Sequence, residues 1–208
     1  MPLWYCVGDT EFYGYTIKTD SRALIPRPET EILVEKALEF IDKDTTVLDL
    51  CTGSGAIAVA VQKQSGAKVT ASDFSEKALS LTKENAELNG ADIEFIYSDM
   101  FNSLADRKFN IIITNPPYIR SQDIDSLQSE IKNFEPIMAL DGGKDGLDFY
   151  RIIAKESITH LFNGGVLLME IGYDQKEQVV NLLQGFSNIE VIKDYDNNDR
   201  IIKAVFNV

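Results

Sequence analysis

The sequence has few cysteines and no long apolar run. Its two cysteines, Cys6 and Cys51, lie far apart and form no CxxC pair, so neither a disulfide framework nor a thiolate metal site is indicated. No apolar stretch is long enough to cross a bilayer, and the N-terminus lacks the basic region and apolar core of a secretory signal. We therefore expect free thiols, no metal, no membrane association and a cytoplasmic location.

Positive charge is also scarce. The chain has 20 Lys+Arg against 33 Asp+Glu, which gives a formal net charge of -13. Proteins that grip a phosphate backbone usually carry a basic surface, and this sequence contains no arginine-rich segment. Nucleic acid is therefore disfavoured as a direct substrate.

The sequence does contain a regular alternation of β-branched runs and helix-period segments. Its 208 residues, 44% of them hydrophobic, are enough for one substantial core. The alternation predicts an α/β fold with a parallel sheet. Strands are expected at 45–50, 67–72, 92–97, 109–114 and 165–171, with helices near 28–41, 55–65, 75–89, 147–161 and 174–185.

The two ends of the chain predict hairpins. Two β-rich runs flank the polar turn at 196–199, which suggests that an antiparallel strand closes the sheet. Residues 1–23 read as a small β-hairpin and linker, ahead of a main domain at 24–208. Its aromatic residues are expected to pack the hairpin onto that domain: Trp4, Phe12, Tyr13 and Tyr15.

A glycine loop follows the first predicted strand of the sheet. In an open α/β sheet the ligand lies outside the carboxyl ends of the strands, so this loop is a candidate site. Gly53 and Gly55 let the backbone turn tightly and approach a ligand. The loop lacks the GK[ST] ending of a phosphate loop and the full GxGxxG of a dinucleotide site. Taken alone, a tight turn without a ligand explains it equally well.

Acidic residues follow the next two predicted strands. Asp73 could accept hydrogen bonds from both hydroxyls of a ribose, or it could cap the following helix. Ser75 could cap that helix equally well, which would leave Asp73 free for a ligand. Asp99 would lie where an adenine amine could donate to it, with Met100 packing on the ring. Taken alone, Asp99 is better explained as a solvated loop carboxylate.

The sequence NPPY at 115–118 follows the apolar run FNIIIT. Prolines fix the backbone and donate no hydrogen bond, so carbonyl groups here are available as acceptors. Asn115 and Pro116 offer two acceptors for the protons of a planar NH2 group, and Tyr118 offers a ring to stack on its plane. We expect Asn115, Pro116 and Tyr118 to be catalytic and Asn115, Pro116, Pro117 and Tyr118 to bind the substrate.

Several blocks together resemble the peptide chain release factor glutamine methyltransferases. NPPY alone is shared with methyltransferases that act on DNA and RNA, so it indicates a chemistry and not a substrate. The more specific blocks are LIPRPETEILVE at 24–35 and EPIMALDGGKDGLDFYRII at 135–153. The family's other blocks occur in its order: GDTEFYG at 8–14, DLCTGSGAIA at 49–58, SDF at 72–74, TNPPYI at 114–119 and LLMEIGYDQ at 167–175.

The resemblance implies a Rossmann-like, class I methyltransferase with a seven-stranded sheet and helices on both faces. S-adenosylmethionine would be held by Cys51, Thr52, Gly53, Ser54, Gly55, Asp73, Met100 and Asn115. The methyl group would go to the glutamine of the GGQ motif in a peptide chain release factor, a protein partner of translation termination. The resemblance also offers Arg27, Glu29 and Thr30 as lining of the donor pocket.

The sequence departs from the family at its start and leaves alternatives open. The family begins with a helical domain that helps to dock the protein substrate, whereas this sequence starts at the hairpin that follows it. Glutamine methylation of a ribosomal protein and methylation of an exocyclic base amine use the same NPPY chemistry. A catalytically silent binding module would show a broken loop or an altered NPPY, and both are intact. His160 is expected at the surface, and Glu170 is either structural or part of the active-site wall.

Overall fold

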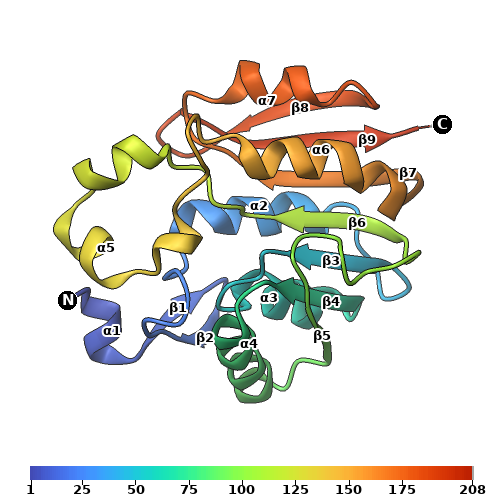
Figure 1. Cartoon of the computed structure of the whole chain (residues 1–208). Helices are drawn as coiled ribbons and strands as arrows, with labels where there is room; N and C mark the ends of the chain where they lie inside the picture. Colours follow the sequence, from blue (N-terminus) through green and yellow to red (C-terminus); the bar gives the residue numbers. More distant parts are fainter. Residues whose placement is uncertain (208) are drawn as a thin grey trace.

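The computed structural model describes residues 1–207, in which seven strands form one mixed sheet (Figure 1). The strand order is β5-β4-β3-β6-β7-β9-β8. The strands are β3 (Thr46–Leu50), β4 (Lys68–Asp73), β5 (Ile93–Tyr97), β6 (Phe109–Thr114), β7 (Leu161–Glu170), β8 (Phe186–Lys193) and β9 (Asp199–Phe206). The first five are parallel, and β9 pairs antiparallel with both β7 and β8. The predicted fold class is confirmed.

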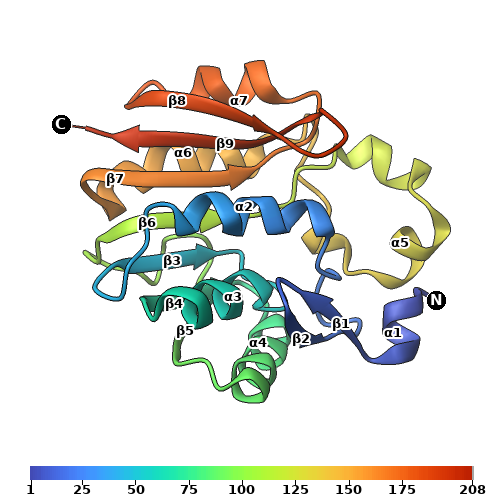
Figure 2. The same ribbon diagram turned by 180° about the vertical axis from the view of Figure 1, so that it is seen from behind.

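Helices cover both faces of this sheet (Figures 1 and 2). On one face, α2 (Pro28–Leu38) and α3 (Ala56–Ser65) bury their apolar side chains against the strands, with α4 (Glu76–Asn89) alongside. On the other, α6 (Asp148–His160) and α7 (Lys176–Leu182) enclose a second core. Of the two caps that the sequence allows, Ser75 caps α4, since its side chain accepts a hydrogen bond from the amide of Ala78.

The N-terminal hairpin is present and is preceded by a short helix that the sequence did not predict. Helix α1 (Leu3–Val7) leads into β1 (Asp9–Phe12) and β2 (Tyr15–Lys18). Phe12 and Ile17 are buried in the first core, so the hairpin packs on the main domain as expected. Trp4 is 42% exposed, and its expected packing role is wrong because α1 turns this side chain outward.

Two other expectations need correction. Strand β7 begins at Leu161 and not at residue 165, because residues 162–165 bulge between the pairs Phe109–Leu161 and Ile111–Val166. His160 is buried and not at the surface: its Nδ1 lies 2.9 Å from the carbonyl oxygen of Arg107, and its ring stacks on Phe101.

Between β6 and α6 lies an insertion of short helices, η1 (Ser121–Ser126), α5 (Ser129–Phe134) and η2 (Ile137–Ala139). It projects from the carboxyl edge of the sheet toward the N-terminal hairpin (Figure 1). At that edge the strands end together, since Leu50 pairs with both Ser72 and Thr114, and Thr114 pairs with Met169. The chain runs from β3 to one side of the sheet and then returns to β6 on the other, so ligand binding is expected there.

Candidate active site

A cavity of about 580 Å³ opens at the carboxyl ends of β3, β4, β5 and β6. Segments before α2 and around η2 complete its wall. Of the residues singled out in the sequence, the wall contains Cys51, Thr52, Gly53, Ser54, Asp73, Asp99, Met100, Asn115 and Pro117, with Arg27 and Thr30. Five other candidates lie outside the wall: Glu29, Gly55, Pro116, Tyr118 and Glu170. The structure thus brings most of the predicted residues to one place.

The glycine loop after β3 has an unusual backbone. Cys51, Gly53 and Gly55 all have left-handed φ values, of 62°, 57° and 81°. At Gly55, an added Cβ would lie 2.5 Å from Cγ2 of Thr82, so only glycine fits. A left-handed conformation costs a residue with a side chain about 1–2 kcal/mol, so Cys51 stores strain at the cavity wall.

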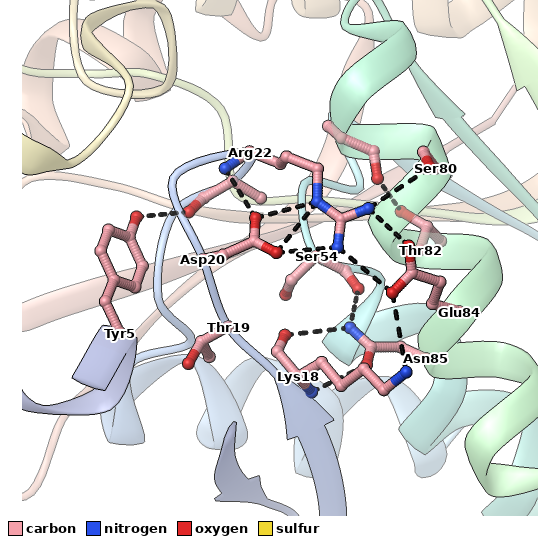
Figure 3. A network of polar contacts seen from close by, with 12 residues as sticks. Tyr5, Lys18, Thr19, Asp20, Arg22, Ser54, Ser80, Thr82, Glu84 and Asn85 are labelled. Atoms are coloured by element: carbon pink, nitrogen blue, oxygen red, sulfur yellow. Dashed lines mark hydrogen bonds and ion pairs between the residues drawn. The ribbon is translucent and has the colours of Figure 1, made fainter. Parts of the chain in front are cut away.

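Two side chains of helix α4 donate hydrogen bonds to the backbone of this loop (Figure 3). The hydroxyl of Thr82 donates to the carbonyl oxygen of Gly53 at 2.9 Å, and Nδ2 of Asn85 donates to that of Ser54 at 2.9 Å. The same Asn85 side chain accepts from the backbone amide of Lys18 and donates to its carbonyl oxygen. One fully buried side chain therefore joins the N-terminal hairpin to the glycine loop.

The segment between the hairpin and α2 is also tied to α4. Arg22, which lines the cavity, forms ion pairs with Asp20 at 2.7 Å and with Glu84 at 2.5 Å (Figure 3). Both carboxylates raise the pKa of Arg22 above its ordinary value. Helix α4 thus holds the start of this segment through Lys18 and Arg22.

Asp73 sits at the end of β4 with its carboxylate already engaged. Its Oδ2 accepts from the amide of Gly53 at 2.9 Å, and its Oδ1 accepts from that of Ser75 at 2.8 Å. Burial raises the pKa of Asp73, and these amides act against that rise. Each carboxylate oxygen retains a further lone pair for a ligand hydroxyl.

Two sulfur atoms meet in the cavity wall. Sγ of Cys51 lies 3.9 Å from Sδ of Met100, a buried residue that also has a left-handed φ, of 48°. Polarizable sulfur makes favourable contacts with aromatic rings. The neighbouring Asp99 is exposed on the same loop and also lines the cavity.

A buried carboxylate lies beneath the glycine loop. Oδ2 of Asp49 accepts from the hydroxyl of Thr52 at 2.5 Å and from the amide of Ala58 at 3.1 Å. Its Oδ1 has no hydrogen-bond partner in residues 1–207. Burial raises the pKa of Asp49 from 3.8 to about 7, and the nearby Asp73 adds to the effect.

The NPPY segment rests on the loop that precedes α6. Ile119 exchanges backbone hydrogen bonds with Leu140 and Gly142, and Nε2 of Gln175 donates to the carbonyl oxygen of Tyr118 at 3.0 Å. A Cβ at Gly142 would lie 2.7 Å from Cα of Tyr118. In the described chain the carbonyl oxygen of Pro116 accepts no hydrogen bond, so it is available as an acceptor.

A chain of hydrogen bonds runs inward from Asn115. Its Nδ2 donates to the hydroxyl of Thr30 at 3.2 Å, and that hydroxyl donates to Oε2 of Glu170 at 2.7 Å. The hydroxyl of Tyr118 donates to the other oxygen of Glu170 at 3.3 Å. Burial raises the pKa of Glu170 and that of Tyr118.

Arg27 connects the start of α2 to the insertion. Its guanidinium lies 2.6 Å from Oε1 of Glu135, a buried carboxylate whose other oxygen accepts from the amide of Ile25. The Arg27 side chain is 31% exposed, but removing it would leave the buried carboxylate of Glu135 without its cation, which is destabilising. This pair therefore holds two walls of the cavity together.

Comparisons with known proteins agree with this geometry. The family model of the methyltransferase small domain matches residues 28–133. The release factor glutamine methyltransferase of Thermodesulfovibrio yellowstonii is 44% identical, over 97% of this chain and 75% of that protein. The release factor glutamine methyltransferase of Clostridium acetobutylicum is 42% identical, over 99% of this chain and 75% of that protein. A methyltransferase from Pyrococcus furiosus, 20% identical over 94% of this chain and 90% of that one, has the same fold with a TM-score of 0.70.

The chain belongs to the release factor glutamine methyltransferase family. It is therefore an S-adenosylmethionine-dependent methyltransferase. The cavity fits that methyl donor in size, since small-molecule sites usually measure about 300–1,000 Å³. Asp73 suits ribose hydroxyls, and the sulfurs of Cys51 and Met100 suit an aromatic base.

Sequence patterns do not reveal several residues that support the walls of this cavity. Thr82, Asn85, Glu135 and Gln175 each bond to a loop distant in the sequence. The sequence points to Thr30 and Glu170 but not to the hydrogen bonds that link them to Asn115. No group of three or more His, Cys, Asp or Glu side chains among residues 1–207 could hold a metal ion. Nor does any helix in that range combine the length and apolar character needed to cross a membrane.

Proposed function

We propose that this enzyme methylates the side-chain amide nitrogen of the glutamine in the GGQ motif of a peptide chain release factor. The observation that carries the proposal is the orientation of the Asn115 amide. Its NH2 group donates a hydrogen bond to Thr30, and its Oδ1 remains available to accept one from a ligand. The curated relatives named for this activity support it, because they match nearly the whole chain. Since release factors act in translation, the proposal places the reaction in the cytoplasm.

In this proposal the cavity holds the methyl donor through part of its lining, the residues at the ends of β3, β4 and β5. Asp73 would bind the ribose hydroxyls, and Met100 with Cys51 would pack on the adenine ring. The glycine loop, residues 51–55, would approach the amino-acid part of the donor with its backbone. S-adenosylmethionine supplies an electrophilic methyl group on a sulfonium centre.

The chemistry needs positioning, because an amide nitrogen is a weak nucleophile whose lone pair is delocalised. Oδ1 of Asn115 and the carbonyl oxygen of Pro116 would accept the two protons of the substrate amide and align its nitrogen. Pro117 would shape the entrance, and the ring of Tyr118, anchored on Glu170, would pack on the amide plane. Alignment of this kind can contribute about 7–11 kcal/mol to lowering a barrier.

Charge favours a protein over a nucleic acid as the substrate. The net charge of -13 repels a polyanion, and an enzyme that methylates a base within a duplex must also flip that base out. A protein loop that presents a glutamine side chain has no phosphate backbone to be repelled and no base to be flipped out.

The test is methyl transfer from radiolabelled S-adenosylmethionine. The enzyme is incubated with an unmethylated release factor, with the same factor carrying alanine in place of the GGQ glutamine, and with bulk DNA and RNA. We expect label on the unaltered release factor alone. Label on nucleic acid, or equal label on the alanine variant, would overturn the proposed substrate.

A further inference from the structure

We infer that Thr30 and Glu170 are positioning residues that fix which end of the Asn115 amide faces the substrate. The inference deepens the proposed function and rests on it. It assigns one shared role to a residue of the LIPRPETEILVE block and a residue at the end of β7, which lie 140 positions apart in the sequence.

The contacts form one buried line across three elements. Glu170, at the end of β7, is 2% exposed, and Thr30, in the first turn of α2, is 5% exposed. The Thr30 hydroxyl lies 2.7 Å from Oε2 of Glu170 and 3.2 Å from Nδ2 of Asn115, which directly follows β6. Asn115 in turn lines the cavity.

Counting protons sets the direction of these bonds. A hydroxyl has one proton to donate, and an ionised carboxylate can only accept. Once Thr30 donates to Glu170, its oxygen can only accept, so Asn115 must turn its NH2 group toward Thr30. Oδ1 of Asn115, which has no hydrogen-bond partner in residues 1–207, is then the end left for the substrate.

The reverse orientation would oppose the reaction. An Asn115 amide turned around would present its own NH2 group to the NH2 group of the substrate, and two donors cannot pair. The two orientations of an amide have the same shape, so packing alone does not choose between them. The choice falls to Thr30 and Glu170.

Other groups around Glu170 support its role as an acceptor. The hydroxyl of Tyr118 donates to its second oxygen, and the positive charge of Arg200 favours the ionised carboxylate. Burial and the negative charge of Glu29 act in the opposite sense. Tyr150 holds the backbone of Glu170, since its hydroxyl donates to the carbonyl oxygen at 2.9 Å.

The test compares Thr30→Val, which keeps the side-chain shape and removes the hydroxyl, with Thr30→Ser, which keeps the hydroxyl. In Thr30→Val we expect kcat on the release factor to fall about 10- to 100-fold, with the Kd for S-adenosylmethionine within about twofold of wild type. Thr30→Ser should recover most of that loss. Glu170→Gln, whose amide can donate to Thr30, should lower kcat in the same way and serves if Thr30→Val does not fold.

Three results would overturn the inference: unchanged kcat in Thr30→Val, an equal loss in Thr30→Ser, or a parallel loss of donor affinity. A second readout needs no substrate. In ¹⁵N spectra of the free protein, the Asn115 side-chain protons should exchange with solvent at least about tenfold faster in Thr30→Val than in wild type. If wild type methylates no release factor, the proposed function fails, and the exchange rates alone then decide on the positioning role. Equal exchange rates would contradict it.

Discussion

At the scale of single residues, Asn115 is the side chain that we propose to hold the reacting amide nitrogen of the substrate. We predict that Asn115→Ala lowers kcat about 100-fold or more, the usual effect of removing one preorganised polar group from an active site. The Kd for S-adenosylmethionine should change only a few-fold. Steady-state kinetics with isothermal titration of the donor checks this, and equal losses in kcat and donor affinity would argue against a positioning role.

Asp49 gives a prediction about pH and stability. Its pKa is 3.8 ordinarily and about 7 in the fold, so between these values the folded protein keeps a proton that the unfolded chain has lost. The free energy of unfolding should therefore fall as pH rises through that interval, by up to about 4 kcal/mol for this group. Urea unfolding of wild type and Asp49→Asn from pH 4 to 7 tests it. A difference between the two proteins that is flat with pH would refute the prediction.

Gly55 and Gly66 form a matched pair at the two ends of α3. Both have left-handed φ values, of 81° and 71°, but only at Gly55 would a Cβ collide with Thr82. Gly66→Ala should lose about 1 kcal/mol of stability and keep its donor affinity. Gly55→Ala should lose more stability and bind S-adenosylmethionine at least about tenfold more weakly. Thermal melts and donor titration measure both, and similar behaviour of the two variants would contradict the account.

At the scale of elements, the loop before α6 supports the NPPY backbone. A Cβ at Gly142 would lie 2.7 Å from Cα of Tyr118 and 2.9 Å from the carbonyl oxygen of Pro117. We predict that Gly142→Ala displaces this backbone and lowers kcat/KM at least about tenfold, since small misplacements at an active site are costly. Gly185→Ala, whose Cβ would only touch Ile158 at 3.4 Å, is the control. Equal activity of the two variants would show that the close approach is unimportant.

The long elements were predictable because their patterns are local. Strand β6 is a run rich in β-branched residues. Helix α4 is bounded by a serine, Ser75, and a glycine, Gly90, which are residues that commonly begin and end helices. The short elements were not. Helices α1 and α5 have five and six residues, too few to show a 3.6-residue period. Burial of His160 depends on a carbonyl group 53 positions away, which no local pattern reveals.

The same limit applies to the candidate site. The glycine loop, Asp73 and NPPY could be found because each follows a strand, and the carboxyl ends of parallel strands meet at one edge. The residues that orient them could not, because contacts such as Thr30–Glu170 and Asn85–Ser54 join distant segments. The sequence therefore reveals the residues of the motifs, whereas the residues that orient them are identified only from the folded structure.

At the scale of the whole molecule, the fold of this acidic protein brings residues from several elements together around the cavity described above. The Arg27–Glu135 ion pair joins the N-terminal segment to the insertion, and Asn85 joins that segment to the glycine loop. The two relatives described above match 97% and 99% of this chain, so the comparison extends over nearly all the residues around the cavity. A protein substrate must therefore bring its reactive side chain to the mouth of this cavity.

The most direct test of the central claim is to locate the methyl group by tandem mass spectrometry. The release factor is treated with the enzyme and S-adenosylmethionine, digested and fragmented. We predict a single methyl group on the side-chain amide of the GGQ glutamine, absent when Asn115→Ala replaces the wild-type enzyme. A methyl group on any other residue, or an unmodified GGQ peptide after full incubation, would contradict the account.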